Sequence, residues 1–218
     1  ALSSVAQRHP GAIKAGIQDR GGDVYAVRFY EVDGRGQKKE QWVEVDADFP
    51  WYQDKNNWAY LQSTQKGELW PALYEKAYAV FKAGGSGDYD TIGQGGWEGD
   101  VMEAVTGLTC DYETIKGQGD DALWQTLQAA SKGKKAMTAG TYHEKGEDDP
   151  RFGKAVGIYG DHAYSVMGVR TRGRGRNKER FVIMRNPWGE GEPTGDGKDD
   201  GIFEITLAMF KEKYEALT

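Results

Sequence analysis

Four segments in the C-terminal part of the sequence decide its fold: AVGIYG (155–160), HAYSVMGVRT (162–171), RFVIMRN (180–186) and GIFEIT (201–206). Each is rich in β-branched and aromatic residues, which favour extended backbone and pack well in sheets. Turns rich in glycine or charged residues separate them, and short connections of that kind join antiparallel neighbours. We therefore expect an antiparallel sheet in this part of the chain.

Helices and an early hairpin precede the expected sheet. Residues 24–32 and 41–47 flank the turn sequence DGRGQ and predict a hairpin, and helices are expected over 68–81 and 121–131. The opening residues 1–7, ALSSVAQ, are typical of the end of a helix whose first turn is missing. Helices that come before a sheet, rather than alternating with its strands, favour an α+β fold over a doubly wound one.

The chain is long enough for two packed subdomains. A stretch rich in Gly, Ser and Asp over 84–99 is the best candidate for their boundary. We expect a helical first subdomain with a hairpin at 1–94, incomplete at its N-terminal end, and a second subdomain built on the antiparallel sheet at 95–218.

Composition excludes several classes of protein. The 28 basic and 34 acidic side chains give a net charge of −6, which disfavours binding to nucleic acid. The sequence has no apolar run long enough to cross a membrane, and its start lacks the order of a signal peptide. We expect a soluble protein, either cytoplasmic or a secreted effector. A single cysteine, Cys110, excludes internal disulfides and cysteine-rich metal clusters.

One histidine and one asparagine carry the candidate chemistry. His162 begins a predicted strand among small residues, and Asn186 ends the next strand. Alone, each has an ordinary interpretation: His162 as a core histidine and Asn186 as a turn former before proline. Adjacent antiparallel strands would bring them side by side, as a thiol protease requires: the imidazole takes the thiol proton while an amide oxygen orients the ring. Trp188 is expected either to cover that hydrogen bond or to pack in the core.

Several blocks resemble the protease core of calpains, a group with the papain-like fold. The similarity is clearest in GDHAYSVMG (160–168), which resembles the block around the calpain catalytic histidine, in RNPWGEGE (185–192), which resembles the block with the catalytic asparagine, and in the helix LWPALYEKAYA (69–79). Weaker blocks follow the same order: WVEVDADFP (42–50), GGWEGDVMEAVTGL (95–108) and DDGIFEIT (199–206). Ordered similarity over nearly the whole chain identifies it as a member of that group.

The resemblance implies a cysteine endopeptidase acting on protein or peptide substrates, with His162 and Asn186 catalytic and Trp188 supporting them. In calpain-like proteases the nucleophile lies in a block like GDCWLLAAL, and ALSSVAQ is similar to the residues just after it. The cysteine and the oxyanion-hole glutamine are therefore expected in a segment upstream of Ala1, and this chain alone is expected to be inactive. The alternative is a catalytically inactive pseudoprotease that binds peptides or proteins.

Cys110 is a tempting substitute for that nucleophile, since Cys110, His162 and Asn186 occur in the order of a triad. No helix N-terminus follows Cys110 to lower the pKa of its thiol. We expect a small, half-buried apolar side chain instead.

A basic run and two acidic clusters stand outside this assignment. RTRGRGRNKER (170–180) holds five Arg and one Lys against one Glu, and its glycine spacing is typical of a solvated hairpin loop. It lacks the aromatic residues of an RNA-binding patch, so a docking surface for an acidic partner is favoured over nucleic acid.

The acidic clusters GEDDP (146–150) and GDGKDDG (195–201) raise the alternative of calcium binding. Calpains bind calcium in loops of the protease core, and Glu192 and Asp200 are similar to two of the positions used there. Ile202 replaces an acidic residue of that pattern, so solvated acidic turns without a cofactor are the favoured interpretation.

Overall fold

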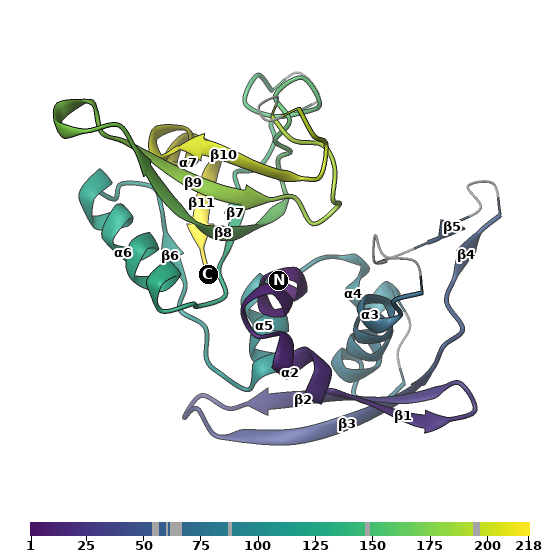
Figure 1. Cartoon of the computed structure of the whole chain (residues 1–218). Coiled ribbons are helices and arrows are strands. Elements are labelled where there is room, and N and C mark those ends of the chain that lie inside the picture. Colours follow the sequence, from purple (N-terminus) through teal and green to yellow (C-terminus); the bar gives the residue numbers. More distant parts are fainter. Residues whose placement is uncertain (54–56, 60, 62–66, 87–88, 147–148, 194–196) are drawn as a thin grey trace. The chain divides into compact units, whose positions relative to one another are not determined.

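The structure is a computed structural model, drawn in Figure 1, and it describes residues 1–53, 57–59, 61, 67–86, 89–146, 149–193 and 197–218. The chain folds as two compact units. The C-terminal unit comprises Ala1, residues 3–8 and residues 111–218, and the N-terminal unit comprises Leu2 and residues 9–110. The subdomain boundary predicted between residues 94 and 95 lies inside the N-terminal unit.

The N-terminal unit combines short helices with a three-stranded antiparallel sheet in the order β1-β2-β3. Its helices are α2 (Pro10–Ala15), α3 (Trp70–Lys82), α4 (Asp90–Gly93) and α5 (Glu98–Thr106); its strands are β1 (Ile17–Gly21), β2 (Val24–Val32) and β3 (Lys38–Asp46), with a small separate pair, β4 (Trp51–Tyr52) and β5 (Asn57–Trp58). The predicted hairpin and the helix predicted over 68–81 are confirmed as β2–β3 and α3. Strand β1 was not predicted because IQDRG is mostly polar.

The apolar face of α3 packs on the three-stranded sheet through aromatic rings. Phe29 of β2 lies edge-on to Tyr74, at 5.9 Å between ring centroids, and stacks on Phe81 at 4.9 Å. The periodicity that predicted α3 thus buries its apolar side chains against β2.

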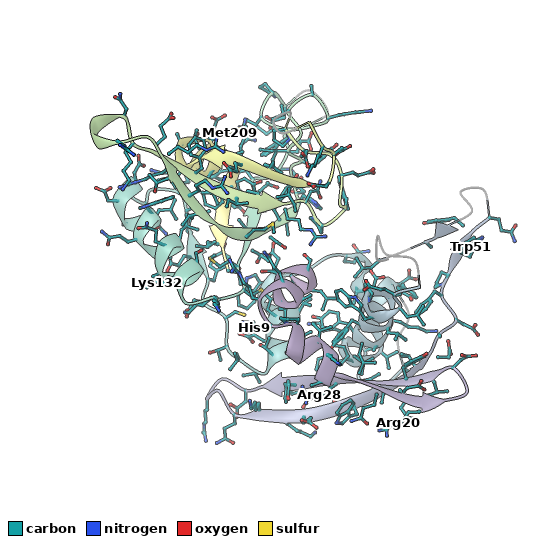
Figure 2. All side chains as sticks on the ribbon, in the orientation of Figure 1. His9, Arg20, Arg28, Trp51, Lys132 and Met209 are labelled. Carbon is teal, nitrogen blue, oxygen red and sulfur yellow. The ribbon has the colours of Figure 1, made fainter. Side chains whose placement is uncertain are left out.

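The C-terminal unit is built on a six-stranded antiparallel sheet in the order β10-β9-β8-β7-β11-β6. Its strands are β6 (Glu113–Thr114), β7 (Thr138–Thr141), β8 (Ala163–Arg172), β9 (Glu179–Arg185), β10 (Ile202–Thr206) and β11 (Tyr214–Leu217); its helices are α1 (Leu2–Arg8), α6 (Asp120–Lys132) and α7 (Leu207–Lys213), with a 3-10 turn at Gly175–Asn177. Figure 2 shows Lys132 at the C-terminal end of α6 and Met209 on α7. The expected α+β fold is confirmed.

The core of the C-terminal unit lies between the sheet and its helices. Leu123 and Leu127 of α6, Phe210 of α7, and Tyr164 and Met184 of the central strands are among its fully buried side chains. Of the helices that the structure describes, none has both the length and the apolar character needed to cross a bilayer.

The strand predicted at 155–160 is wrong. Residues 154–157 form a turn, and Ile158 makes only an isolated bridge to Gly153. Both Gly153 and Gly157 have left-handed backbone, with φ of 98° and 73°, which closes the turn. A Cβ on Gly157 would also collide with the backbone of Glu192 and Pro193. The alternating apolar residues therefore pack a turn against another loop instead of extending the sheet.

Helix α1 is tied to the strands of the C-terminal unit by its serines. The hydroxyl of Ser4, which is 1% exposed, donates to the carbonyl of Met137 at 2.8 Å and accepts from its N–H at 2.9 Å. The hydroxyls of Ser3 and Ser165 are 2.8 Å apart, and Arg8 donates to the carbonyl of Met167. The first residues of the chain are thereby fixed against β8.

Replacing Ser4→Ala should lower the free energy of unfolding by about 1–3 kcal/mol, because the buried N–H of Met137 loses its partner, while the carbonyl of Met137 keeps only the N–H of Val166. Urea denaturation of the purified chain measures this change. Ser86→Ala, at an exposed position, is the matched control and should alter stability by less than about 0.5 kcal/mol. An S4A variant as stable as the parent would show that this contact does not hold α1 in place.

Candidate active site

The structure brings His162 and Asn186 together. His162 directly precedes β8 and Asn186 directly follows β9, and these neighbouring strands pair with Ser165 opposite Arg185. The Nε2 atom of His162 lies 3.1 Å from Oδ1 of Asn186. The proximity expected from adjacent antiparallel strands is therefore confirmed, whereas the catalytic roles of the two residues stay predictions.

The amide of Asn186 is held in one orientation. The side chain is fully buried, and its Nδ2 donates to the carbonyls of Glu190 at 2.8 Å and Gly191 at 3.1 Å. Only the amide nitrogen can donate to carbonyl groups, so Oδ1 must face the imidazole. An acceptor at that position requires the proton of neutral His162 on Nε2. The other ring nitrogen, Nδ1, is then the basic one.

The loop after Asn186 is held by a hydrogen bond to its backbone and by the close approach of Gly201 to the backbone of Asn186. Gly191 adopts a φ of 71°, and its N–H donates to the Asp199 carboxylate at 2.7 Å. Gly201 also has left-handed backbone, and a Cβ there would lie 3.0 Å from the carbonyl oxygen of Asn186. This packing keeps the two carbonyls that orient the Asn186 amide in place.

Aromatic rings surround the His162 imidazole. Trp188 lies over it, at 4.4 Å between ring centroids and tilted by 34°, while the buried Tyr164 meets it edge-on at 4.8 Å. Tyr159 contacts Trp188 edge-on at 4.8 Å. Trp188 is 57% exposed, which contradicts simple core packing, and its supporting role stays a prediction. No sequence pattern pointed to the two tyrosines, although both lie within three residues of His162.

The backbone of His162 is fixed by Thr141 at the end of β7. The Thr141 hydroxyl accepts from the N–H of His162 and donates to its carbonyl, both at 3.0 Å, and the Thr141 N–H donates to the same carbonyl at 2.9 Å. The preceding residue, Asp161, has left-handed backbone with a φ of 49°. Its carboxylate accepts from Nδ1 of His143 at 2.8 Å and from the N–H of Glu144 at 3.1 Å. Contacts on both sides of the turn thus position the imidazole.

The surroundings of His162 favour its neutral form. Burial lowers the pKa of the imidazole below 6.5, the hydrogen bond to Asn186 opposes this effect, and the positive amino group of Ala1 adds to the lowering. A neutral imidazole at neutral pH can accept a proton, as a general base must. The contact of Ser3 with Ser165 places the start of α1 beside the strand that follows His162.

Cys110 belongs to the N-terminal unit and is half-buried in a non-helical segment after α5. Its N–H donates to the carboxylate of Glu103 at 2.7 Å. The next helix begins only at Asp120, so no helix N-terminus acts on its thiol. The expectation that Cys110 is not the nucleophile stays a prediction.

The carboxylates of the second acidic cluster that the structure describes make contacts within the chain. Asp199 accepts from Gly191, and Asp200 accepts from the N–H of Ile202 at 3.0 Å, while Glu192 is half-buried. Within the described ranges, no three His, Cys, Asp or Glu side chains gather as a metal site would require. Residues 147–148 and 195–196 of the acidic clusters lie outside those ranges, and calcium binding stays untested.

Comparison with known proteins finds relatives over most of the chain. The model of the calpain family of cysteine proteases matches residues 14–213. A thiol protease of Porphyromonas gingivalis is 30% identical over 177 residues, covering 68% of this chain and 35% of its own length. Calpain-B of Drosophila melanogaster is 33% identical over 159 residues, which cover 68% of this chain and 16% of calpain-B. Human calpain-8 is 32% identical over 165 residues, which cover 73% of this chain and 22% of calpain-8. The chain thus spans about a third or less of the length of these relatives.

Replacing Asn186→Ala should lower the pKa of His162 further, because the hydrogen bond to Asn186 raises that pKa. Titration of the His162 Hε1 resonance by NMR measures the change. Since the folded-state pKa lies below the unfolded value, the free energy of unfolding should fall as the pH drops through 6.5, and more steeply in the variant. Asn177→Ala, in an exposed turn, is the control. A His162 pKa that rises or stays constant in N186A would contradict the assigned hydrogen bond.

Replacing Thr141→Val should expose the backbone amide of His162, since valine keeps the shape of threonine but removes the hydroxyl acceptor. Hydrogen exchange at that amide is expected to speed up by about tenfold or more, with a loss of about 1–2 kcal/mol in unfolding free energy. Thr141→Ser retains a hydroxyl and should restore slow exchange. Equal exchange rates in T141V and the parent would remove Thr141 from this positioning role.

Proposed function

Because the chain belongs to the calpain family of cysteine proteases, we propose that it is the His/Asn-bearing part of an endopeptidase that hydrolyses peptide bonds in protein substrates. The observation that carries the proposal is the hydrogen bond of 3.1 Å between Nε2 of His162 and Oδ1 of Asn186. It fixes the imidazole so that Nδ1 is the nitrogen able to exchange protons. A histidine that served only in packing would not require a buried amide held by two backbone carbonyls.

We place the nucleophilic cysteine in residues that precede Ala1 in the intact protein. One observation supports this position: Ser3 of α1 contacts Ser165, three residues after His162. A polypeptide continuing upstream from Ala1 therefore begins close to the imidazole. A cysteine there would also lie near the N-terminal end of the longer helix, which favours its thiolate.

In the proposed reaction, Nδ1 of His162 takes the thiol proton, and the thiolate attacks the carbonyl carbon of the scissile peptide bond. Nδ1 then gives its proton to the leaving amine, so that the C–N bond breaks and an acyl-enzyme remains. Water loses a proton to the same nitrogen and attacks the thioester carbonyl, which releases the acid and restores the thiol. Throughout, Asn186 keeps the Nε2 proton in place and Trp188 shields that hydrogen bond from water.

The thiolate also changes the balance of charges at His162. Burial alone disfavours the imidazolium, as the lowered pKa shows. A thiolate within a few ångströms stabilises it, since an opposite charge raises the pKa of a neighbouring base. The site is therefore suited to an ion pair in which each partner supports the charged state of the other.

The alternative from a different class is an inactive pseudoprotease that binds a peptide or protein. It predicts that the residue at the nucleophile position is Ser, Ala or Gly. The contacts among His162, Asn186 and Trp188 favour the enzyme, because a protein that only binds peptides does not require the hydrogen bond between His162 and Asn186.

The decisive experiment extends the chain by about ten of its natural upstream residues and measures casein cleavage. We expect cleavage at neutral pH, a loss of at least about 10³-fold in His162→Ala, and no loss in Cys110→Ala, the control for the cysteine of this chain. The assay is run with calcium and with a chelator, and equal rates would indicate that residues 195–201 form only a turn. Full activity in H162A would refute the mechanism, and an upstream Ser, Ala or Gly in place of cysteine would support the binding module.

A further inference from the structure

The hairpin formed by β8 and β9 carries a basic surface that the proposed catalysis does not use. Its connecting residues 173–178 lie at the far end of both strands from His162 and Asn186, and Figure 1 shows this end projecting beyond α6. The run RTRGRGRNKER, which covers this region, contributes five Arg and one Lys to a protein of net charge −6. A cluster of positive side chains on a protein of negative net charge is a candidate binding surface.

The carboxylates of the chain neutralise only part of this charge. Arg170 and Arg172 share a single acidic partner, Glu204, at 2.7 and 2.5 Å. Arg180 pairs with Asp121 at 2.6 Å. Since one carboxylate serves two guanidinium groups, a positive charge remains beside β10 even where ion pairs form.

Two cations at the turn have no acidic partner among the described residues. Arg174 and Lys178 are both exposed and make no side-chain hydrogen bond or ion pair within that part of the chain. Their positions are set by a tight turn: Gly173 has a φ of 81°, and a Cβ there would collide with the carbonyl of Asn177. The turn thus presents Arg174 and Lys178 to solvent on a constrained backbone, which reduces the entropy lost on binding.

The chemistry of the hairpin favours an acidic peptide over nucleic acid or a membrane. Single-stranded nucleic acid binds by stacking on exposed rings, but the guanidinium of Arg172 lies over Phe181 at 4.8 Å and that of Arg180 over Trp124 at 5.5 Å. Insertion into a bilayer needs apolar side chains at the tip, and residues 170–180 contain none. Moreover, a nucleic acid or a bilayer extends beyond the hairpin and meets the acidic remainder of the molecule. A short acidic segment contacts the basic surface alone.

We propose that the tip of the β8–β9 hairpin binds a short, Asp- and Glu-rich segment of another protein. Arg174 and Lys178 donate charge-assisted hydrogen bonds to its carboxylates, and the excess charge of Arg170 and Arg172 adds a longer-range attraction. The interaction requires no proteolysis, so it stands whether or not the proposed enzymatic function is correct.

Fluorescence anisotropy of a labelled peptide of about twelve residues, alternating Glu and Gly, tests this proposal with the full chain at low ionic strength. We expect Arg174→Glu/Lys178→Glu to weaken binding by about tenfold or more, and added salt to weaken binding to the parent protein. The control Lys14→Glu/Lys116→Glu makes the same change in net charge at exposed lysines elsewhere and should stay within about twofold of the parent. Circular dichroism confirms that each variant is folded.

Three results would overturn the proposal. One is equal binding of the peptide to the hairpin variant and to the control. Another is that a single-stranded oligonucleotide, or phosphatidylserine vesicles, bind the parent protein more tightly than the peptide does and lose this binding in the Arg174→Glu/Lys178→Glu variant. That result would assign the surface to nucleic acid or to a membrane. The third is hairpin-dependent self-association in sedimentation without peptide binding, which would make a second copy of this chain the partner.

Discussion

The antiparallel pairing of β8 with β9 is the interaction on which the candidate site depends. Because Ser165 lies opposite Arg185, His162 enters one strand where Asn186 leaves the next, and the two side chains meet at 3.1 Å. A shift of one residue in this register would turn alternate side chains to the opposite face and separate the pair. The same two strands continue to the basic turn, so one ladder of hydrogen bonds positions both the imidazole and the exposed cations of the hairpin.

Loops rather than strands complete the site. The Asn186 amide is oriented by backbone carbonyls at residues 190 and 191, and Gly157 packs against the following residues where no side chain would fit. Thr141 fixes the backbone of His162 from a third strand. Burial then lowers the pKa of the imidazole and favours the neutral form. The rigid sheet sets the distance, and the loops set the orientation and the electrostatics.

Charge is used differently at the two ends of the hairpin. Near His162, the environment is half-buried and aromatic, so a single proton changes the local electrostatics strongly. At the turn, Arg174 and Lys178 are solvated, and their interactions are weak, additive and sensitive to salt. The first arrangement suits proton transfer and the second suits reversible recognition, which is why one strand pair can support both proposals without conflict.

Sequence alone determined the α+β fold, the β2–β3 hairpin, the helices α3 and α6, and the proximity of His162 to Asn186, because these depend on periodicity and on neighbouring strands. It failed for residues 155–160, where alternating apolar residues pack a turn whose glycines have left-handed backbone. It also missed the short strands β7 and β11, which have too few residues to show a period. Only the tertiary structure decided the orientation of the Asn186 amide, the exposure of Trp188 and the attachment of α1 to β8. Helix α1 contacts a strand more than 150 residues away, and the loop that orients the Asn186 amide packs against Gly157, so neither result follows from a local sequence pattern.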